Sequence, residues 1–420
     1  GHLTCYEITQ FFENFYVSTF GEGGEPNDDI VSFVKQNDAF VTRMVDTDLY
    51  WSHVGDVYAR SAGMLEGYNG SPCSLQPGFK PLSKMDWNLL QLDGDLFDLM
   101  TAFPDKETLL GQLIGQLTSL ITSPFTFFAT AAVTDKVLRC SALIKLTSSD
   151  LFFGHDTWDT YSTASPRIYK TISLPVRNPN GPPILHVDSF SSSPGFVASI
   201  DDYYTISGTS ALTVIETSNN VYDVRAYKAL SPESVFCWAR TMVANQMAGD
   251  GEAWGEAFSE LHSGTYNNQW LIVDRGRIDE DEGLLVVVEE APGLMHSEDM
   301  TGRLRSDGYW GSYNVAFYED IRAVMGETEG YWDAPRAKIF AELQSSVEDM
   351  DSMTYVMGYN NYLNDPNSEG KNLFSTSTPS SSLTPPTTNL SPTSHFPQSP
   401  SPPKTLIKES HPPKRGLEQP

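Results

Sequence analysis

The spacing of apolar side chains changes near residue 140, and this change constrains the fold more than any other feature. Before about residue 110, runs such as "DDIVSFVKQNDAFVTRMV" and "WNLLQLDGDLFDLMTAF" repeat apolar residues three and four positions apart, as amphipathic helices do. From Cys140 onward the chain is rich in short runs of Val, Ile, Thr and aromatic residues: "ALIKL", "LFFGH", "ILHVDSF", "GFVASI", "ALTVIET", "VYDVRAY", "WLIVDRG" and "LLVVVEEAPG". Such runs are typical of β-strands. A helical part followed by a strand-rich part predicts an α+β fold.

One segment inside the strand-rich part has the pattern of helices. It runs from Ser231 to Leu261, opens with the helix-start signal Ser-Pro-Glu, and is broken by Gly-Asp-Gly at 249–251. Helices inserted among strands fit a layered body in which helices pack on sheets.

Composition divides the chain into three parts. Residues 1–139 are mainly helical, and within them 111–135 is interpreted as an atypical insert or linker. Pro124 and several Gln, Ser and Thr make that uncharged stretch a poor membrane span. Residues 140–365 are strand-rich. Residues 366–420 are dominated by Pro, Ser and Thr with little to bury, so we expect a disordered tail.

The charge of the chain limits its partners. The 54 acidic and 27 basic residues give a formal charge of −27. Such a charge repels phosphate backbones and anionic membrane surfaces, so we expect no nucleic-acid partner. Because the longest uncharged stretch is a poor membrane span, we also expect no transmembrane segment. Four cysteines, Cys5, Cys73, Cys140 and Cys237, allow at most two disulfides, and no CxxC pair suggests a zinc site or a redox dithiol.

The sequence lacks the common catalytic and cofactor motifs. It contains no GxSxG elbow, no HExxH pair, no Walker loop and no GxGxxG fingerprint. The acidic strings "LDGDLFDL" and "DEDEG" do not have EF-hand spacing, and we interpret them as solvated acidic turns. The sequence therefore predicts neither a cofactor nor a metal ion.

The stretch "KVLRCSALIKL" places Cys140 at the front of a strand-like run, where it could be a core thiol, half of a disulfide or a nucleophile. If "CSALIKL" and "LFFGH" pair through the polar turn "TSSD", Leu146 lies opposite Leu151. Counting outward then brings Ala142 opposite His155. On that register His155 shares a sheet face with Cys140, diagonally at about 7 to 8 Å between backbone positions, which long side chains can close.

Several long strings occur in one order: "CSALIKLTSSDLFFGHDTWDTY", "GTYNNQWLIVD", "YWGSYNVAFYEDI", "PRAKIF" and "VEDMDSMTYVMGYNNYLNDP". With "LLQLDGDLFDL" and "ANQMAGDGEAW", they resemble the phospholipase B-like family, the laminin-ancestor group of N-terminal nucleophile (Ntn) hydrolases, over roughly residues 1–365. The resemblance implies a four-layer αββα sandwich of two stacked sheets between helices. It also implies that this chain lacks the family's N-terminal strands and its C-terminal segment.

The same resemblance implies a precursor that cuts its own chain between Arg139 and Cys140, after which light and heavy chains stay associated. Cys140 would then carry both a thiol and a free α-amine. An α-amine with a pKa of about 7.7 to 8.0 can take the thiol proton, so one residue supplies nucleophile and base. Attack on a carbonyl gives an oxyanion and then an acyl-thioester that water hydrolyses. Arg139 is long and charged where the family usually has a small residue.

Further site residues follow from the resemblance. His155 and Trp158 match "HDTW", Asn314 matches "SYN" and Arg336 matches "PRA". Asn314 would donate to the oxyanion, and Arg336 would act as a charged clamp near the nucleophile or substrate. Each position also has a structural alternative: Trp158 could fill the core, Asn314 could hold a turn, and Arg336 could pair with a nearby carboxylate, Asp333 or Glu342.

Two more positions are less sharply defined. The threonine that the family has after the strand "ALTVIET" falls at Ser218, with Thr217 beside it, and either hydroxyl could serve. Asn267 and Asn268 in "YNNQW" precede a strand and are expected to organise a bend.

The resemblance implies an acyl hydrolase that cleaves carboxylic ester bonds of phospholipids or lysophospholipids, so an acylated small molecule or lipid is the expected partner. An amidase acting on N-acyl lipids or peptide-like amides is one alternative, and a non-enzymatic lysosomal or secreted binding protein is another. A secreted or lysosomal-type lumen is the expected location, and the acidic composition fits an acidic lumen. The triplet Asn69-Gly70-Ser71 gives weak support for glycosylation.

Overall fold

The computed structural model describes residues 1–45, 47–76, 79–104, 140–157, 166–178, 181–199, 203–361, 363–368 and 407–408. These residues form helices and two antiparallel sheets, so the predicted α+β class is confirmed. The expected insert at 111–135 lies outside the described residues, as does most of the 366–420 tail.

The first part of the chain is helical, as its periodicity predicts. It forms α1 (Cys5–Phe20), α2 (Asp28–Met44), α3 (Leu49–Asn69), the 3-10 helix η1 (Pro72–Leu75), α4 (Lys84–Gln91) and α5 (Asp93–Ala102). Side-chain capping explains where two of these helices begin. The Asn27 side chain accepts from the Ile30 N–H at the start of α2, and Asp48 caps α3 in the same way. A disulfide between Cys5 and Cys73 joins α1 to η1.

The strands form two sheets. The smaller has the order β10–β1–β2–β11, with β1 (Ser141–Leu146), β2 (Leu151–Asp156), β10 (Tyr309–Ser312) and β11 (Ile407–Lys408). The larger runs in chain order through β3 (Ile168–Val176), β4 (Ile184–Ser192), β5 (Tyr203–Ser207), β6 (Leu212–Ser218), β7 (Asn268–Asp274), β8 (Leu285–Ala291) and β9 (Leu294–Asp299). Every neighbouring pair in both orders is antiparallel.

Both faces of the larger sheet are covered along β6, β7 and β8, whose residues are almost all buried. Helices α7 (Cys237–Met247) and α8 (Gly251–Ser259) share a core with one face, where Trp254 of α8 contacts Trp270 of β7. The other face shares a core with the smaller sheet, and the Phe153 ring of β2 lies 6.4 Å from the Tyr203 ring of β5. Burial on both sides explains why β7 and β8 read as continuous apolar runs rather than alternating ones.

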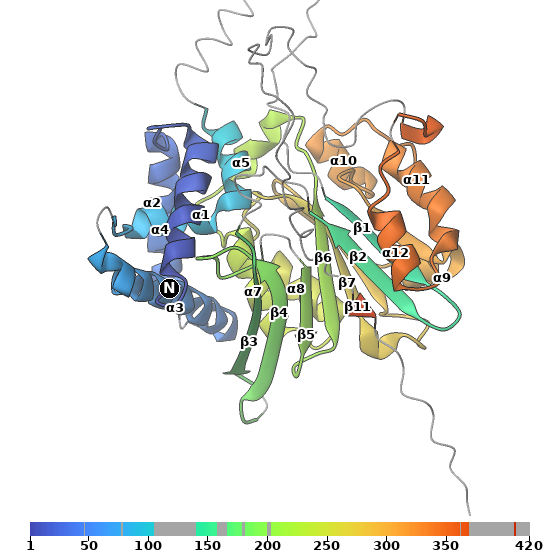
Figure 1. Ribbon diagram of the computed structural model, residues 1–420, viewed down its shortest axis with the longest axis horizontal. Coiled ribbons are helices and arrows are strands. Elements are labelled where there is room, and N and C mark those ends of the chain that lie inside the picture. Colours follow the sequence, from blue (N-terminus) through green and yellow to red (C-terminus); the bar gives the residue numbers. More distant parts are fainter. Residues whose placement is uncertain are drawn as a thin grey trace, which may run out of the picture.

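Short helices complete the second half of the chain. They are η2 (Val224–Ala229), η3 (Arg275–Arg277), α9 (Thr301–Asp307), α10 (Glu319–Met325), α11 (Pro335–Leu343), η4 (Gln344–Ser346), α12 (Met350–Met357) and η5 (Pro366–Ser368). Helices α11 and α12 contact the smaller sheet, and Figure 1 shows them, in orange, on the side of the molecule opposite the blue N-terminal helices.

Two runs expected to be strands are not strands. In "GFVASI" the backbone of Gly195 and Val197 is bound by the side chain of Gln91 in α4, which takes the place of a strand partner. In "VYDVRAY" the Asp223 side chain accepts from the Arg225 N–H and starts η2. In both cases a polar side chain bonds the backbone in place of a strand partner and overrides the apolar pattern. The Asp223 bond is local, whereas Gln91 is 104 residues from Gly195.

The helical segment after residue 230 begins later than its start signal predicts. Ser231 caps a tight turn, accepting from the Glu233 N–H, and α7 starts only at Cys237. The intervening backbone is held by Asn37 of α2, whose amide donates to the carbonyls of Pro232 and Ser234. The break before α8 is confirmed, with Asp250 as the cap of that helix.

Candidate functional site

The hairpin of β1 and β2 carries the candidate nucleophile. Its register is the one that the spacing predicts, with Leu146 opposite Leu151. Ala142 lies opposite His155, also as predicted. Cys140 directly precedes β1, is 4% exposed and is a thiol rather than half of a disulfide. The structure therefore excludes the disulfide and leaves two interpretations of Cys140, a core thiol or a nucleophile.

Three reactive side chains meet at this hairpin. The Cys140 Sγ, a ring nitrogen of His155 and a carboxylate oxygen of Glu216 all lie within 4.8 Å of one another. His155 Nε2 lies 2.8 Å from the Glu216 carbonyl oxygen, and Nδ1 lies 3.3 Å from the Thr157 hydroxyl. Because a carbonyl oxygen only accepts, Nε2 carries a proton and donates it to the Glu216 carbonyl. These contacts orient the imidazole beside the thiol.

Glu216 is a site residue that the sequence reasoning did not identify. It lies in β6, is 1% exposed, and its carboxylate accepts from the Tyr266 hydroxyl at 3.3 Å and the Ser218 hydroxyl at 3.5 Å. The available signal was a charged residue inside the apolar run "ALTVIET". A buried charge is costly unless it is paired or used, so such a residue marks a functional candidate.

Arg336 connects Cys140 to a loop that is distant in sequence. It lies in the first turn of α11, and its Nη1 donates to the Cys140 carbonyl and, at 3.0 Å, to the Ser141 hydroxyl. Its Nη2 donates to the Tyr313 carbonyl and, at 2.7 Å, to the Asn314 Oδ1. The planar guanidinium, with donors on both sides, suits this bridging role.

Asn314 sits in a backbone conformation that favours its residue type. It follows β10 with a φ of 68°, in the left-handed region that Asn tolerates better than most residues. Its Nδ2 donates to the Ser218 carbonyl, while its backbone N–H lies 3.4 Å from the Thr217 Oγ1. Thr217 Oγ1 in turn lies 2.6 Å from the Ser312 hydroxyl. The two predicted hydroxyl positions and Asn314 are thus brought together at the end of β6.

A buried polar network fixes the loop that carries Asn314. Glu289 of β8 accepts from the backbone N–H groups of Phe317 at 2.7 Å and Tyr318 at 2.9 Å, and from the Gln269 amide at 2.6 Å. Gln269 also accepts from the Trp310 indole at 3.2 Å. Burial raises the pKa of Glu289 to about 7.

The acidic string of α5 is not a solvated turn, which corrects the sequence interpretation. Asp95 and Asp98 are each 1% exposed and bind the loop before β7. Asp95 accepts from the Thr265 hydroxyl, and Asp98 accepts from the Tyr266 N–H at 2.7 Å. Burial raises the pKa of Asp95 to about 7. The string "DEDEG", in contrast, is exposed at Asp279–Glu282, as expected.

The remaining predicted positions divide into two groups. Asn267 and Asn268 organise a bend, as expected: Asn267 Nδ2 donates to the Gly264 carbonyl and Asn268 Nδ2 to the Tyr266 carbonyl. Trp158 and Arg139 lie outside the described residues.

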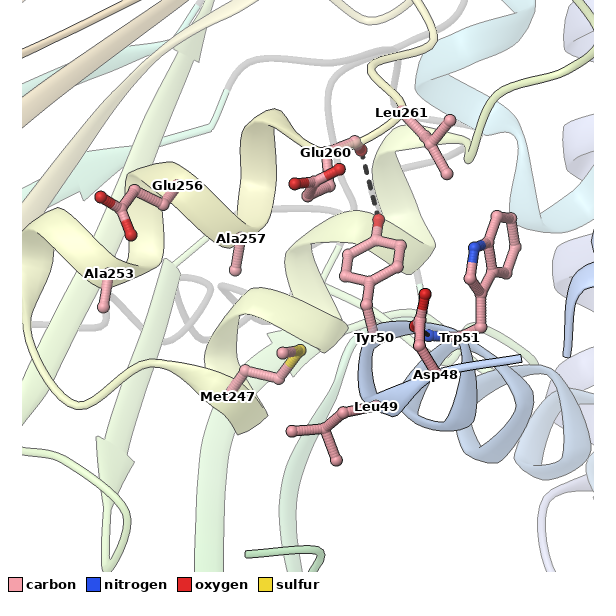
Figure 2. Close-up of a pocket in the computed structure, with 10 residues that line it drawn as sticks. All are labelled: Asp48, Leu49, Tyr50, Trp51, Met247, Ala253, Glu256, Ala257, Glu260 and Leu261. Carbon is pink, nitrogen blue, oxygen red and sulfur yellow. Dashed lines mark hydrogen bonds between the residues drawn. The ribbon is translucent and has the colours of Figure 1, made fainter. Parts of the chain in front are cut away.

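A surface pocket lies apart from the Cys140 cluster. Figure 2 shows it between the start of α3 and helix α8, with a volume of about 500 Å³. Tyr50 borders it and donates through its hydroxyl to the Glu260 carbonyl at 3.2 Å. Its lining contains carboxylates and apolar side chains but no cysteine, serine or histidine, so it has no counterpart of the Cys140 thiol or the His155 imidazole.

Comparison with known proteins places the chain among relatives of one kind. A family model described as Phospholipase B matches residues 1–387. The chain is 34% identical over 394 residues to Phospholipase B-like protein A of Dictyostelium discoideum, a match covering 88% of this chain and 66% of that relative. It is 33% identical to Phospholipase B-like 1 of Bos taurus over 390 residues, covering 88% and 66% respectively. It is 32% identical to Phospholipase B of Crotalus adamanteus over 386 residues, covering 87% and 66%.

The matched portion is large but does not span those relatives. The chain covers 66% of the length of each of these three, just under two thirds. Among the described residues, no helix has the length and apolar composition needed to cross a membrane. The resemblance noted in the sequence is therefore confirmed at the level of the family: this chain belongs to the phospholipase B family.

Proposed function

We propose that the chain is the precursor of a cysteine acyl hydrolase that cleaves carboxylic ester bonds of phospholipids or lysophospholipids through the Cys140 thiol. The observation that carries the proposal is the convergence of the Cys140 thiol, the His155 imidazole and the Glu216 carboxylate within 4.8 Å. Family membership supports a phospholipase-like hydrolase. The guanidinium of Arg336, bound to the Cys140 carbonyl, adds a positive charge that favours a thiolate nearby.

Maturation would use the same thiol. The Cys140 Sγ attacks the carbonyl carbon of Arg139, the Arg139–Cys140 C–N bond breaks, and a thioester forms. Water then hydrolyses the thioester, which returns the thiol and leaves a free α-amine on Cys140. Arg336 would hold the strand end during this exchange through its bond to the Cys140 carbonyl.

In the mature enzyme the α-amine of Cys140 would accept the thiol proton. The thiolate attacks the ester carbonyl, the alcohol leaves with a proton, and water hydrolyses the acyl-thioester. Asn314 and a hydroxyl of Thr217 or Ser218 would donate to the oxyanion. In support, Asn314 accepts from Arg336, which also binds the Cys140 carbonyl, and Asn314 bonds Thr217 and the Ser218 carbonyl. His155 would position the thiol, and Trp158 would support the substrate.

Two further features support the proposed architecture. The order of packing, helices α7 and α8, larger sheet, smaller sheet, then α11 and α12, fits a four-layer Ntn hydrolase. Asn37 and Asp95 belong to the prospective light chain, yet they hydrogen-bond to residues of the prospective heavy chain. These buried bonds would keep the two chains associated after cleavage.

A secreted or lysosomal-type location is supported by the Cys5–Cys73 disulfide, because such bonds persist in oxidising compartments. Glycosylation at Asn69 is disfavoured. Its Nδ2, the atom that a glycan would modify, donates to the Leu82 carbonyl at 3.0 Å, and Ser71 of the same triplet is buried.

The main alternative is an amidase acting on N-acyl lipids or peptide-like amides. It is favoured by the chemistry of maturation, which is itself an amide cleavage by the Cys140 thiol. A non-enzymatic binding protein is the remaining possibility, and it predicts no hydrolysis of either bond.

The proposal is tested with an ester and an amide that carry the same acyl chain, assayed in buffer containing a metal chelator. We expect ester hydrolysis to exceed amide hydrolysis, and Cys140→Ala to lower it about a thousandfold or more. Cys237→Ala is the matched control, because Cys237 is also a buried thiol but does not belong to the cluster. Unchanged hydrolysis in Cys140→Ala would refute the proposal, and preference for the amide would favour the alternative.

A further inference from the structure

The Cys140 cluster combines three ligand types that transition metals use. Sulfur, imidazole nitrogen and carboxylate oxygen come from three separate elements: the residue before β1, the strand β2 and the strand β6. In a tetrahedral zinc site the bonds are about 2.0 to 2.3 Å, which puts ligand atoms about 3.3 to 3.8 Å apart. The atoms here lie within 4.8 Å of one another, so small side-chain rotations bring them to that spacing.

Two of the ligand side chains are also held by hydrogen bonds to neighbouring groups, as metal ligands usually are. The His155 ring is held by the Glu216 carbonyl at 2.8 Å, and imidazole ligands typically bond a carbonyl or carboxylate through their second nitrogen. The Glu216 carboxylate is held by the Tyr266 hydroxyl at 3.3 Å. Strands β1 and β2 are paired in register, and β1 contacts β6. His155 and Glu216 therefore lie on paired strands, and Cys140 directly precedes one.

We propose that Cys140, His155 and Glu216 form a binding site for Zn²⁺, and that the bound ion blocks the nucleophile. The sulfur ligand excludes Ca²⁺ and Mg²⁺, which take oxygen ligands, whereas a mixed sulfur, nitrogen and oxygen set suits Zn²⁺. On binding, the Cys140 S–H bond breaks, a sulfur–zinc bond forms and the proton passes to solvent. A water molecule, or the α-amine after cleavage, supplies the fourth ligand. Metal binding itself stands independently, whereas the block of hydrolysis rests on the proposed function.

Binding is tested on the full chain, stripped of metal with a chelator that is then removed. Co²⁺ serves as a coloured stand-in for Zn²⁺, because a thiolate ligand gives it a charge-transfer absorption band. We expect one equivalent of Co²⁺ to produce that band, one equivalent of Zn²⁺ to abolish it by displacement, and Mg²⁺ to leave it unchanged.

Variants assign the ligands. Cys140→Ser is expected to lose the band, while Cys237→Ser, at the other described thiol, keeps it. His155→Gln and Glu216→Gln are each expected to weaken Zn²⁺ binding about tenfold or more. Even substitution of a residue that only hydrogen-bonds to a metal ligand lowers metal affinity by about that factor. Circular dichroism of every variant confirms that the fold is retained. A band that survives in Cys140→Ser, or a folded wild-type chain that gives no band, overturns the proposal.

The consequence for activity is measured separately. Hydrolysis in the presence of chelator reports the proposed function without metal, and addition of one equivalent of Zn²⁺ in chelator-free buffer should reduce it about tenfold or more. Hydrolysis that continues unchanged at full Zn²⁺ occupancy refutes the block while leaving the proposed function intact. A chain that binds Zn²⁺ through Cys140 but hydrolyses nothing in chelator refutes the function while leaving the metal site intact.

Discussion

At the scale of single residues, one guanidinium holds the site together. Arg336 bonds the Cys140 carbonyl on one side and the Tyr313 carbonyl and Asn314 side chain on the other. Cys140 and Arg336 are 196 residues apart in sequence, so their contact depends on the complete fold. The candidate nucleophile and the candidate oxyanion donor are thus joined by a single side chain.

We predict that Arg336→Lys lowers the rate of ester hydrolysis by about tenfold or more, because an ammonium cannot bridge two groups as the planar guanidinium does. Steady-state kinetics measures the effect, mainly in kcat. Arg303→Lys is the matched control, since the Arg303 side chain of α9 is exposed and pairs with Asp307. Full activity in Arg336→Lys would show that the bridge has no role in positioning the site.

Local and distant site residues differ in how well the sequence predicts them. The pairing of Ala142 with His155 follows from the two-residue period of strands and one short turn, and it is confirmed. Asn314 and Arg336 became candidates only through the family resemblance, because no local pattern relates them to Cys140. Glu216 was not predicted, because the stacking of the two sheets decides which residue of β6 lies near the thiol.

At the scale of elements, helix α5 reaches the site through one loop. Asp95 and Asp98 bind residues 265 and 266, and Tyr266 of that loop donates to Glu216. Tyr266 has a φ of 53°, a left-handed conformation that the buried carboxylates help to maintain. The string that looked like a solvated turn is therefore a support for the site, and its burial followed from partners that are distant in sequence.

Gly94 of α5 offers a test of that support. A Cβ at this position would lie 2.5 Å from the Tyr266 Cδ2, so Gly94→Ala must displace the ring that bonds Glu216. We predict a loss of about 1 to 3 kcal/mol of stability, with a parallel loss of activity. Thermal unfolding and hydrolysis assays measure both.

Gly63→Ala in α3 is the control for this change. A Cβ there meets nothing within 4 Å, and alanine favours the helix by about 0.5 to 1 kcal/mol. Equal melting temperatures for Gly94→Ala and Gly63→Ala would contradict the proposed role of the α5 contact.

At the scale of the whole molecule, buried carboxyl groups and the net charge of −27 both make the fold less stable as pH rises. Asp95 and Glu289 both have a pKa raised to about 7 by burial. Below the unfolded-state pKa of about 4 both states are protonated, so burial carries no charge penalty. As pH rises from there to about 7 the unfolded state ionises first, and stability falls. The fold is therefore suited to an acidic compartment with respect to these groups.

We predict that Asp95→Asn removes part of this pH dependence. The stability of the wild type relative to Asp95→Asn should fall between about pH 5 and about pH 7, by at most about 1.4 kcal/mol per pH unit. Thermal unfolding at several pH values measures the difference. Asp223→Asn is the control, because the Arg225 partner lowers the pKa of Asp223 to about 2, outside that range. Parallel curves for the wild type and Asp95→Asn would contradict the assignment.

The layered organisation was predictable from the sequence at the level of class but not of stacking. Helical and strand periods on either side of Cys140 gave the α+β class, which the sheets confirm. The same periods misassigned "GFVASI" and "VYDVRAY", where Gln91 and Asp223 satisfy the backbone instead of a strand partner. Periodicity reports which face is buried, whereas side-chain bonds to the backbone depend on neighbours that it does not specify.

We propose that Cys140 becomes a chain terminus, and N-terminal sequencing reveals that terminus. The purified full-length protein is incubated at acid pH, separated by denaturing electrophoresis, and its fragments are sequenced. We predict a heavy chain that begins Cys-Ser-Ala-Leu in the wild type and in Cys237→Ala, and an uncut chain in Cys140→Ala. A wild-type chain that stays intact, or a fragment that begins at any other residue, would refute cleavage at the Arg139–Cys140 bond.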